Sequence, residues 1–424
     1  MEWTPILILF LLFFSGIPIA YALLGAALFY FCVLHQEISI TMLFDTITET
    51  VQNQELWALL LFMLASSVLR YSGVGKRLHR LAESLVGHWP GSLAQVNVVW
   101  SMLMGGVSGS ANADAAMQSQ LLVPEMESCG YSKGFSAAIT AASSAVTPVI
   151  PPGINLLVYA ALTASYISVG RMFAAGILPG VLMAAALMAA VAVISKKRNY
   201  PAGRSKRAES SEIFTCLKHS VWGLLYPLGI ILGLMSDVFT TPEVALLALL
   251  YSIFIGSVCY KELKTKYLLM ILRETIEAAA GVFLIILAAR LFQLYLNCEA
   301  VADLFTAAVP VVLQNRAAML LLVNVLLLVL GLFFEGGAIL IVMAPLLLPV
   351  VSAWGVDPIH FGVLCVMNTT IGGLTPPFGS MMLTCCSITG CPLKTFVKEC
   401  VPFIFVLILA LLLVTYIPIF AMYF

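Results

Sequence analysis

The chain has 424 residues, of which 61% are hydrophobic and only 10% are charged, and its mean hydropathy is +1.04. A soluble domain carries roughly a quarter charged residues, so this composition predicts a polytopic membrane protein. Lys and Arg together number 21, as do Asp and Glu, so no net charge favours nucleic-acid binding. The ten cysteines and five histidines show neither C-x2-C nor H-E-x-x-H spacing, which argues against a zinc hydrolase or a redox disulfide centre.

The N-terminal apolar run is too long for a signal peptide and lacks a basic start, so we expect it to stay in the mature protein. A membrane-spanning helix needs about 20 apolar residues. Residues 4–34 exceed one span and fall short of two comfortable ones, and Pro18 marks a kink or a turn within them. An acidic loop, residues 35–55, and a second span, residues 56–69, follow.

Basic residues come directly after the second span. They are Arg70, Lys76, Arg77 and Arg80. Lys and Arg concentrate on the cytoplasmic side of membrane proteins, so this segment is predicted to face the cytoplasm. Apolar residues repeat through the same segment at helical spacing, at Val74, Leu78, Leu81 and Leu85. The pattern predicts an amphipathic helix, which either lies along the inner membrane interface or caps the helix bundle.

Two apolar segments in the first half are interrupted. Residues 96–124 contain a small, polar, glycine-rich stretch at 105–116. Because a membrane-embedded backbone leaves the helix only where protein or water satisfies it, we expect a re-entrant helical hairpin that lines a solute or ion site. Residues 135–161 are broken by three prolines within 148–152, each of which removes a backbone donor. A span at 178–194 then leads into a basic linker.

The second half repeats this order of segments. Its spans are expected at about 221–235, 243–259 and 277–296, with a basic loop at 261–273, a hairpin at about 320–351, a proline-broken helix at about 360–385, and a final span from residue 401. The hairpin turns at residues 335–337, and the broken helix is interrupted at 371–379. We therefore predict a first repeat at residues 1–195, a cytoplasmic linker at 196–217, and a second repeat at 218–424.

The two halves align residue by residue. A shift of 227 places residues 96–98 on 323–325 and 109–111 on 336–338, and a shift of 225 places Pro151 and Pro152 on Pro376 and Pro377. Corresponding loops carry opposite charge. The loop before the second span holds four acids and no base, whereas residues 261–274 hold four bases and two acids. Four bases precede the first hairpin, whereas Glu299 and Asp303 precede the second. The sequence thus predicts repeats of inverted topology.

The predicted fold is an all-α polytopic membrane protein with two inverted-topology repeats, each with a re-entrant hairpin and a proline-broken helix. Secondary transporters place substrate and coupling-ion sites at such broken helices. Free carbonyls and hydroxyls suit Na+, and the positive N-terminal ends of helices suit a carboxylate. An enzyme would need an activated nucleophile, a metal cluster or a paired acid and base, and the sequence shows no such constellation. A passive channel would not require inverted, proline-broken repeats.

Four motifs, at residues 105–116, 141–152, 239–243 and 373–377, resemble those of the large membrane subunit (DctM-like M subunit) of TRAP transporters. The similarity extends over nearly the whole chain. The resemblance implies an elevator-type Na+ symporter for organic acids, such as a C4-dicarboxylate or sialic acid, in the bacterial inner membrane. It also implies two partners, a small four-span membrane subunit and a periplasmic substrate-binding protein. The alternative is a Na+-coupled dicarboxylate carrier that works without a binding protein.

The resemblance also implies binding residues. The first sodium site would use Ser108, Gly109, Ser110, Thr147 and Gly153, and the second Gly336, Gly337, Gly372, Thr375 and Phe378. Substrate would lie between the tips, near Ser110, Asn112, Pro152, Asn155, Pro377 and Ser380. The chain departs from many relatives, which have Gly at Thr147, Ser at Gly153 and an Asp-Thr-Thr-like second tip. These departures bear on substrate identity more than on mechanism.

Two acidic residues within the interrupted segments remain open to two interpretations. Asp114 is an intramembrane carboxylate and so a functional candidate, but it could also cap a hairpin arm or pair with a cation. Glu335 matches Ser108 in the repeat alignment and is either a helix cap or a neighbour of an ion site.

Overall fold

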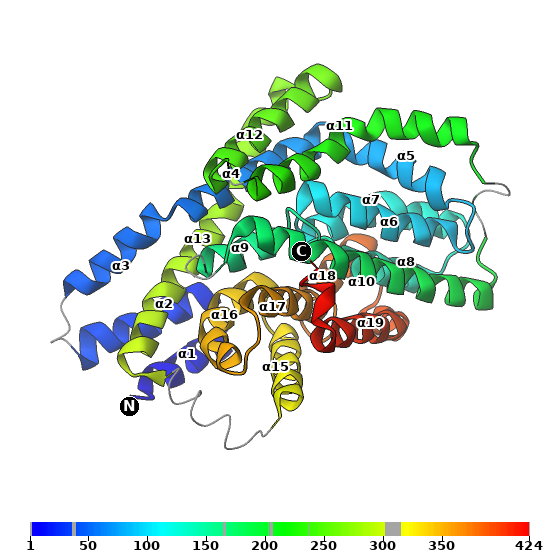
Figure 1. The fold of residues 1–424 in the computed structure, drawn as a ribbon. Coiled ribbons are helices and arrows are strands. Elements are labelled where there is room, and N and C mark those ends of the chain that lie inside the picture. The colour runs from blue at the N-terminus through cyan, green and yellow to red at the C-terminus, as the bar shows by residue number, and fades with distance from the viewer. Residues whose placement is uncertain are drawn as a thin grey trace.

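The computed structural model describes residues 2–35, 40–163, 167–201, 203, 207–236, 238–301 and 315–423. Every regular element in these ranges is a helix, which confirms the predicted all-α class (Figure 1). Six helices among them are long and apolar enough to cross a membrane, or up to seven if a bent pair counts as one span. The protein is therefore a multi-pass membrane protein. Residues 204–206 of the predicted linker and Asp303 lie outside the described residues.

The N-terminal run forms two short helices. α1 (Thr4–Phe14) and α2 (Ile19–Phe29) are separated at Gly16, which has a φ of 85°, and a π-helical turn, Tyr30–Leu34, prolongs α2. The next segment corrects a prediction, because most of the expected acidic loop is a helix, α3 (Ile40–Gln52). Leu43, Ile47 and Thr50 lie on one side of α3, and Leu43 and Thr50 are buried. This helical spacing packs α3 against α13, although the segment is too polar to be a span.

α4 (Gln54–Tyr71) and α5 (Val74–Val86) meet at a bend of 69°. Gly73 forms the bend with a φ of 80°, in the left-handed region that favours glycine. The structure confirms that α5 is amphipathic, since Val74, Leu78 and Leu81 are buried. Leu85 was predicted on the same face but is exposed.

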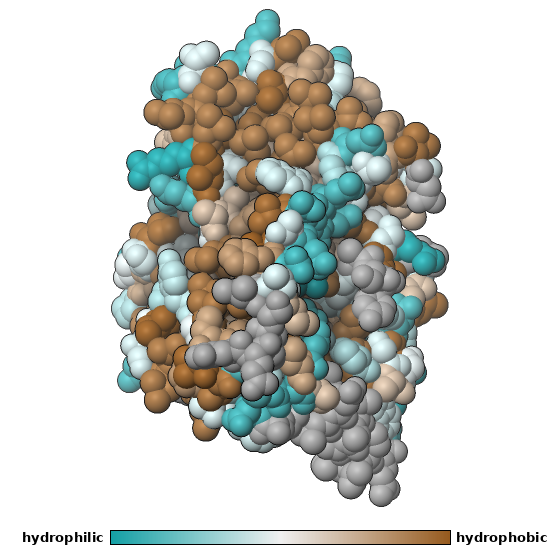
Figure 2. Space-filling view, turned by 90° about the vertical axis from the view of Figure 1, so that its left-hand side faces the viewer, coloured by the Kyte–Doolittle hydropathy of each residue, from teal (hydrophilic) through white to brown (hydrophobic). Residues whose placement is uncertain are grey.

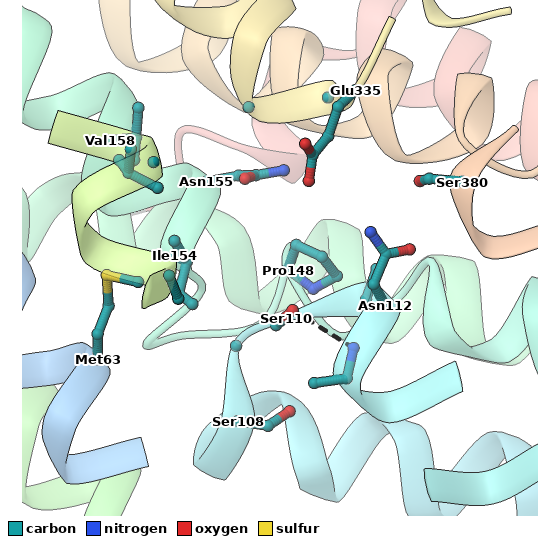
Figure 3. Close-up of a pocket in the computed structure, with 18 of the residues that line it drawn as sticks. Met63, Ser108, Ser110, Asn112, Pro148, Ile154, Asn155, Val158, Glu335 and Ser380 are labelled. Atoms are coloured by element: carbon teal, nitrogen blue, oxygen red, sulfur yellow. Dashed lines mark hydrogen bonds between the residues drawn. The ribbon is translucent and has the colours of Figure 1, made fainter. Parts of the chain in front are cut away.

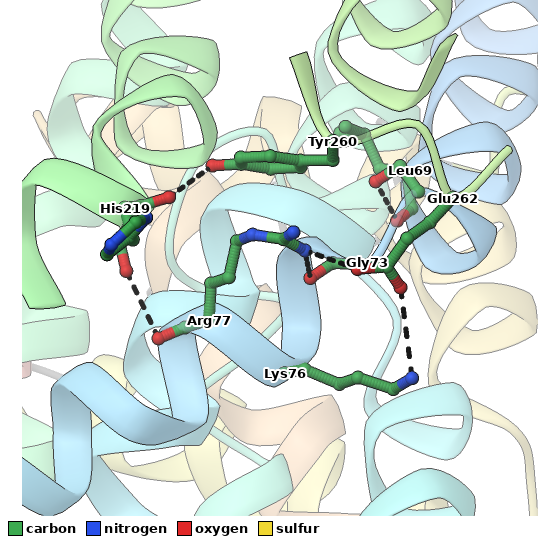
Figure 4. Close-up of polar contacts among 9 residues, drawn as sticks. Leu69, Gly73, Lys76, Arg77, His219, Tyr260 and Glu262 are labelled. Carbon is green, nitrogen blue, oxygen red and sulfur yellow. Dashed lines mark hydrogen bonds and ion pairs between the residues drawn. The ribbon is translucent and has the colours of Figure 1, made fainter. Parts of the chain in front are cut away.

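A polar cluster holds α5 against α11 and against the segment that follows α12 (Figure 4). Arg77 donates from Nη1 to the carbonyl of Gly73 at 2.9 Å and to Oε1 of Glu262 at 2.7 Å. The guanidinium also lies 3.8 Å from the centroid of the Tyr260 ring. Tyr260 in turn donates its hydroxyl to the carbonyl of His219 at 2.8 Å. The basic segment is thus fixed through its side chains as well as through its apolar face.

The rest of the first half contains the hairpin and the broken helix. Its helices are α6 (Ser92–Ser108), α7 (Ala111–Ser128), α8 (Lys133–Ser144), α9 (Ile154–Leu162) and α10 (Val169–Arg198). α6 and α7 form the two arms of the hairpin, and α8 and α9 are the halves of the broken helix. α10 starts earlier than the apolar run at 178–194 and ends beyond it, so the span was underestimated at both ends.

The second half also contains a hairpin and a broken helix. Its helices are α11 (Ser210–Met235), α12 (Thr241–Phe254, followed by a π-helical turn, Ile255–Cys259), α13 (Leu268–Cys298, preceded by a 3-10 turn, Thr265–Tyr267), α15 (Arg316–Gly331), α16 (Gly336–Ala353), α17 (Pro358–Gly372), α18 (Ser380–Thr389) and α19 (Leu393–Tyr416, followed by a 3-10 turn, Pro418–Phe420). α15 and α16 form the hairpin, and α17 and α18 form the broken helix. The expected basic loop at 261–273 is shorter than predicted, because residues from Leu268 onward already belong to α13.

The helices form two groups that determine where the site lies. In one group α4 packs against α12 and α13, and α13 packs against α2. In the other the two halves of the chain are intermixed, since α18 packs on α7 and α8, and α16 packs on α9. α4 and α13 contact this second group through α9 and α16 (Figure 1). We call the first group the scaffold and the second the hairpin body.

The surface agrees with a membrane location. Figure 2 shows broad hydrophobic areas on the face it presents, interrupted by hydrophilic side chains. Large apolar side chains are exposed on several of the spanning helices, among them Leu246, Leu247 and Leu250 of α12. Such residues would be unfavourable in water and are favourable against lipid acyl chains.

Candidate functional site

The first hairpin tip, residues 108–110, closes through a left-handed glycine. Gly109 has a φ of 59°, and a Cβ there would lie 2.6 Å from the carbonyl oxygen of Pro152. The Gly109 carbonyl accepts a hydrogen bond of 3.2 Å from the backbone N–H of Ile154, at the start of α9. Ser110 is the N-cap of α7 and accepts from the N–H of Ala113 at 3.5 Å. The tip is thus attached directly to the break between α8 and α9.

A buried polar cluster lies behind this tip. Asp114 is completely buried, and its Oδ2 accepts from Ser101 at 2.7 Å, from Gln118 at 2.8 Å and from the hydroxyl of Thr147 at 3.0 Å. Asp114 therefore links both hairpin arms to the broken helix. This geometry supports the structural interpretation of Asp114 as a residue that holds the hairpin together. Its Oδ1 has no hydrogen-bond partner in the described part of the chain.

The second tip, residues 332–335, is built differently. Glu335 is the N-cap of α16, but its side chain makes no capping hydrogen bond. Gly331, at the end of α15, packs on Gly372, where a Cβ would lie only 2.5 Å from the Gly331 Cα. The backbone N–H of Phe378 donates to the carbonyl of Leu332 at 3.2 Å. This tip, like the first, is attached to the break in the proline-broken helix of its own half.

Both tips line one cavity of about 480 Å³ between the hairpin body and the scaffold. Figure 3 shows Asn112, Asn155, Ser380 and Glu335 pointing into it, from elements of both halves. The Glu335 carboxylate lies between Asn155 and Ser380 in this view. The structure therefore argues against a helix-capping side chain at Glu335 and places its carboxylate at the cavity.

The predicted site residues fall into two groups. Those that line the cavity are Ser108, Gly109, Ser110, Asn112, Asn155, Gly336, Gly337 and Ser380. Those outside the cavity lining are Gly372, the last residue of α17, and six residues of the two breaks, Thr147, Pro152, Gly153, Thr375, Pro377 and Phe378. Their placement has local causes. The Thr147 hydroxyl donates into the Asp114 cluster, the Thr375 hydroxyl donates to the Gly372 carbonyl at 2.7 Å, and the Phe378 ring is exposed.

The prediction missed the scaffold wall of the cavity. α4 contributes Met63, Ser66, Ser67 and Arg70, and α13 contributes a row of residues that begins at Glu274. Polar residues at 66, 67 and 70 at the end of an apolar run share one helix face, and this spacing was a usable signal. Arg70 had been used only to orient the chain in the membrane.

A second cavity of about 380 Å³ lies farther along α13. Its lining includes Ala289, Phe292 and Asn297 of α13, with part of α16 opposite them. Ile341 of α16 lines both cavities. The last α13 residue of the first cavity is Ile285, one helical turn from Ala289, which is about 6 Å along the axis.

The polar groups that line the first cavity can bind a ligand. Its polar atoms are hydroxyls, amides, backbone groups and three charged side chains, Arg70, Glu274 and Glu335. Among the described residues, no group of three or more His, Cys, Asp or Glu side chains could hold a metal ion. Hydroxyl and carbonyl oxygens of this kind can coordinate a monovalent cation.

A family model and individual relatives of this chain point to the same family. The family described as the DctM component of tripartite ATP-independent periplasmic transporters matches residues 6–420. The chain is 35% identical over 407 residues to the sialic acid TRAP transporter large permease protein SiaM of Vibrio cholerae, covering 96% of this chain and 94% of that protein. It is 33% identical over 370 residues to the C4-dicarboxylate TRAP transporter large permease protein DctM of Pseudomonas aeruginosa. The alignment covers 87% of this chain and 86% of that protein.

Among solved structures, the chain resembles the YdaH transporter of Alcanivorax borkumensis with a TM-score of 0.67, covering 90% of this chain and 88% of that one. The two sequences are 15% identical, so this likeness concerns the fold alone.

Proposed function

We propose, from the premise that the chain belongs to the DctM family of tripartite ATP-independent periplasmic transporters, that it imports an organic anion in symport with Na+. The family makes the chain the large permease of such a transporter. The proposal includes the bacterial inner membrane, a small four-span subunit, and a periplasmic protein that delivers the substrate. Sialic acid and C4-dicarboxylates, which appear in the names of relatives, are the first candidates.

One observation carries the anion part of the proposal. Four helices begin at the cavity, and residues of their N-terminal ends line it: α7 at Ala111, α9 at Ile154, α16 at Gly336 and α18 at Ser380. The N-terminal end of a helix carries a partial positive charge and free N–H groups, so it attracts carboxylates. Four such ends, two from each half of the chain, favour an anion at the centre of the cavity.

The sodium part rests on oxygen atoms near the same tips. The proposed first site uses Ser108, Gly109, Ser110, Thr147 and Gly153, and the proposed second site uses Gly336, Gly337, Gly372, Thr375 and Phe378. In the breaks and at the tips, carbonyls are released from regular helical bonding and can turn toward a cation. Glu335 adds a negative charge beside the second site. Na+ at the tips would offset this charge before an anion enters.

An elevator movement would fit the division into two groups of helices. The hairpins and broken helices pack on one another in the hairpin body, whereas α4 and α13 belong to the scaffold. The cavity lies between the two groups. A displacement of the hairpin body along α13 would carry the cavity and its contents across the membrane, while the packing inside the hairpin body is kept.

Reconstitution tests the proposal. The large and small subunits are placed together in liposomes with an inward Na+ gradient, and uptake of labelled sialic acid and labelled succinate is measured with and without a periplasmic binding protein that binds the probe. We expect uptake of one probe that requires both Na+ and the binding protein. Equal uptake without the binding protein would favour the alternative, a Na+-coupled dicarboxylate carrier that takes free substrate. Uptake that is unchanged when K+ replaces Na+ would refute sodium coupling.

A further inference from the structure

On the scaffold side of the first cavity, α4 contributes two serines and a cationic side chain, Arg70. Met63, Ser66, Ser67 and Arg70 lie at intervals of three and four residues on α4, so they share one face of that helix. Among the described residues that line the cavity, Arg70 is the only one with a cationic side chain. The two acidic side chains that line it are Glu274 and Glu335. An anion that moves away from the tips along this wall therefore meets one attractive charge, at Arg70.

Arg70 already holds a carboxylate, but through few contacts. Its Nη1 donates to Oε2 of Glu274 at 3.2 Å, and the two side chains are 37% and 33% exposed. A guanidinium carries five donors and binds a carboxylate most strongly with two parallel hydrogen bonds. This hydrogen bond to Glu274 is the one that the structure gives Arg70 within its described residues. An incoming carboxylate that makes the two-bond contact would compete favourably with Glu274.

Glu274 has a second partner that remains when Arg70 is occupied. The hydroxyl of Tyr71, next to Arg70 on α4, donates to Oε1 of Glu274 at 2.6 Å. A carboxylate that loses its cation but keeps a short hydrogen bond and access to water avoids most of the cost of an unpaired charge. The Glu274 side chain is therefore placed to give up Arg70 and to take it back.

We propose that Arg70 is an anion-exchange residue of the transport path, at which the carboxylate of the transported anion replaces the carboxylate of Glu274. Departure of the anion restores the pair between Arg70 and Glu274. The inference rests on the proposed function for its substrate class. Arg70 begins the basic segment that the charge pattern assigns to the cytoplasmic side, so the exchange belongs to release on that side.

Three variants test the exchange with the purified complex. For Glu274→Gln, Arg70→Gln and Arg70→Lys, the melting temperature of the complex is measured at increasing concentrations of sialic acid or of succinate. NaCl at matched ionic strength is the control. In Glu274→Gln the competitor is removed and Tyr71 keeps a partner, so we expect about tenfold tighter binding of at least one probe. In the double variant Arg70→Gln/Glu274→Gln, this gain in affinity should be lost. Arg70→Lys should keep only part of the affinity, because an ammonium lacks the two-bond geometry.

A purely structural pair gives a different result. If Arg70 and Glu274 only join α4 to α13, both Gln variants lower the melting temperature without a change in probe affinity, and the proposal is overturned. Probe binding in Glu274→Gln that equals wild type, or no binding of either probe to Glu274→Gln, also overturns it. The double variant Arg70→Gln/Glu274→Gln leaves neither charge without its partner, so it serves if Arg70→Gln alone fails to fold.

Uptake separates this proposal from the proposed function. A Glu274→Gln protein that binds a carboxylate more tightly should release it more slowly, which lowers both kcat and KM for sodium-driven uptake. Tighter probe binding in a complex without sodium-driven uptake would refute the proposed function and support Arg70 as an anion site. Sodium-driven uptake with unchanged probe affinity and an unchanged kcat would support the function and refute the exchange.

Discussion

The first hairpin tip turns at Gly109 with hydroxyls on both sides, whereas the second turns at Glu335 and continues into two glycines. Behind the first tip, the Asp114 cluster ties both arms to the broken helix through side chains. Behind the second, Gly331 and Gly372 bring two backbones into direct contact. Each tip also accepts one backbone hydrogen bond from the break in its own half.

This difference shows that one architecture can be held in place by two kinds of contact. The first tip depends on a conformation that only glycine adopts easily and on a satisfied buried carboxylate oxygen. The second depends on close packing and leaves its carboxylate free to face the cavity. The first tip therefore offers neutral ligands, and the second tip offers the negative charge. The following variants test this division, beginning with the largest expected effect.

Replacement of a hydroxyl near each tip should abolish sodium-dependent uptake. Ser108→Leu places a bulky apolar group in the cavity lining, and Thr375→Leu removes the hydroxyl that bonds the Gly372 carbonyl. We expect loss of Na+-dependent uptake with normal assembly with the small subunit, measured by size-exclusion chromatography. Ser128→Leu, at an exposed site at the end of α7, is the control. Unchanged sodium dependence would refute the site assignment.

Addition of a methyl group should distinguish the two tips. Gly109→Ala forces a side chain into the left-handed region and against the Pro152 carbonyl, at a cost of at least about 1–2 kcal/mol. Gly337→Ala meets no atom within 4 Å, so we expect a change within about 0.5 kcal/mol. Thermal unfolding in detergent measures both. Equal destabilisation by the two variants would contradict the described difference in packing.

Neutralisation of the second tip should weaken sodium binding. At an effective dielectric of about 20, two unit charges about 8 Å apart attract by about 2 kcal/mol. We therefore expect Glu335→Gln to raise the half-saturating Na+ concentration for uptake about thirtyfold. Glu127→Gln, which removes an exposed carboxylate at the end of α7, should leave it unchanged. An unaltered Na+ requirement in Glu335→Gln would mean that this carboxylate does not act on the cation.

The smallest effects concern the caps of the two broken helices. Ser132 caps α8 with a hydrogen bond of 3.4 Å from the N–H of Phe135, and Asp357 caps α17 with one of 2.7 Å from the N–H of Ile359. Loss of an N-cap costs about 1 kcal/mol, and an acidic cap also interacts with the helix dipole. Asp357→Ala should therefore lower the melting temperature more than Ser132→Ala. The reverse order would show that the shorter bond is not the stronger one here.

The all-helical fold could be predicted because the length of an apolar run and the position of a proline determine the local backbone structure. The helices that were missed are those for which apolar length says little. α3 contains Asp45 and Glu49, and the start of α13 contains Arg273, so a criterion based on apolar length read them as loops. Helical spacing of Leu43 and Ile47, which pack toward the core, was the available signal in α3.

The cavity could be predicted only where it is formed by the repeated motifs. The alignment of the halves located the first tip, because Gly109 determines the backbone geometry there. It placed the second at 335–337, which overlaps the observed tip at 332–335 only at Glu335, since Gly336 and Gly337 already belong to α16. It could not show that Thr147 turns toward Asp114, since no periodicity determines side-chain direction in a non-helical turn. Nor could it find the scaffold wall, because Arg70 and Glu274 are 204 residues apart and meet only through the packing of α4 on α13.

The two cavities come close together near Ile341, and this short separation bears on where the membrane potential falls. The two cavities approach each other along α13 to within one helical turn on either side of this residue. An orientation in which each cavity opened to one side of the membrane would place most of the voltage across this short layer rather than across the whole bilayer. Moving one charge through 100 mV changes its free energy by about 2.3 kcal/mol. A cation that passes this layer would therefore draw nearly the full electrical driving force over a displacement of a few ångströms.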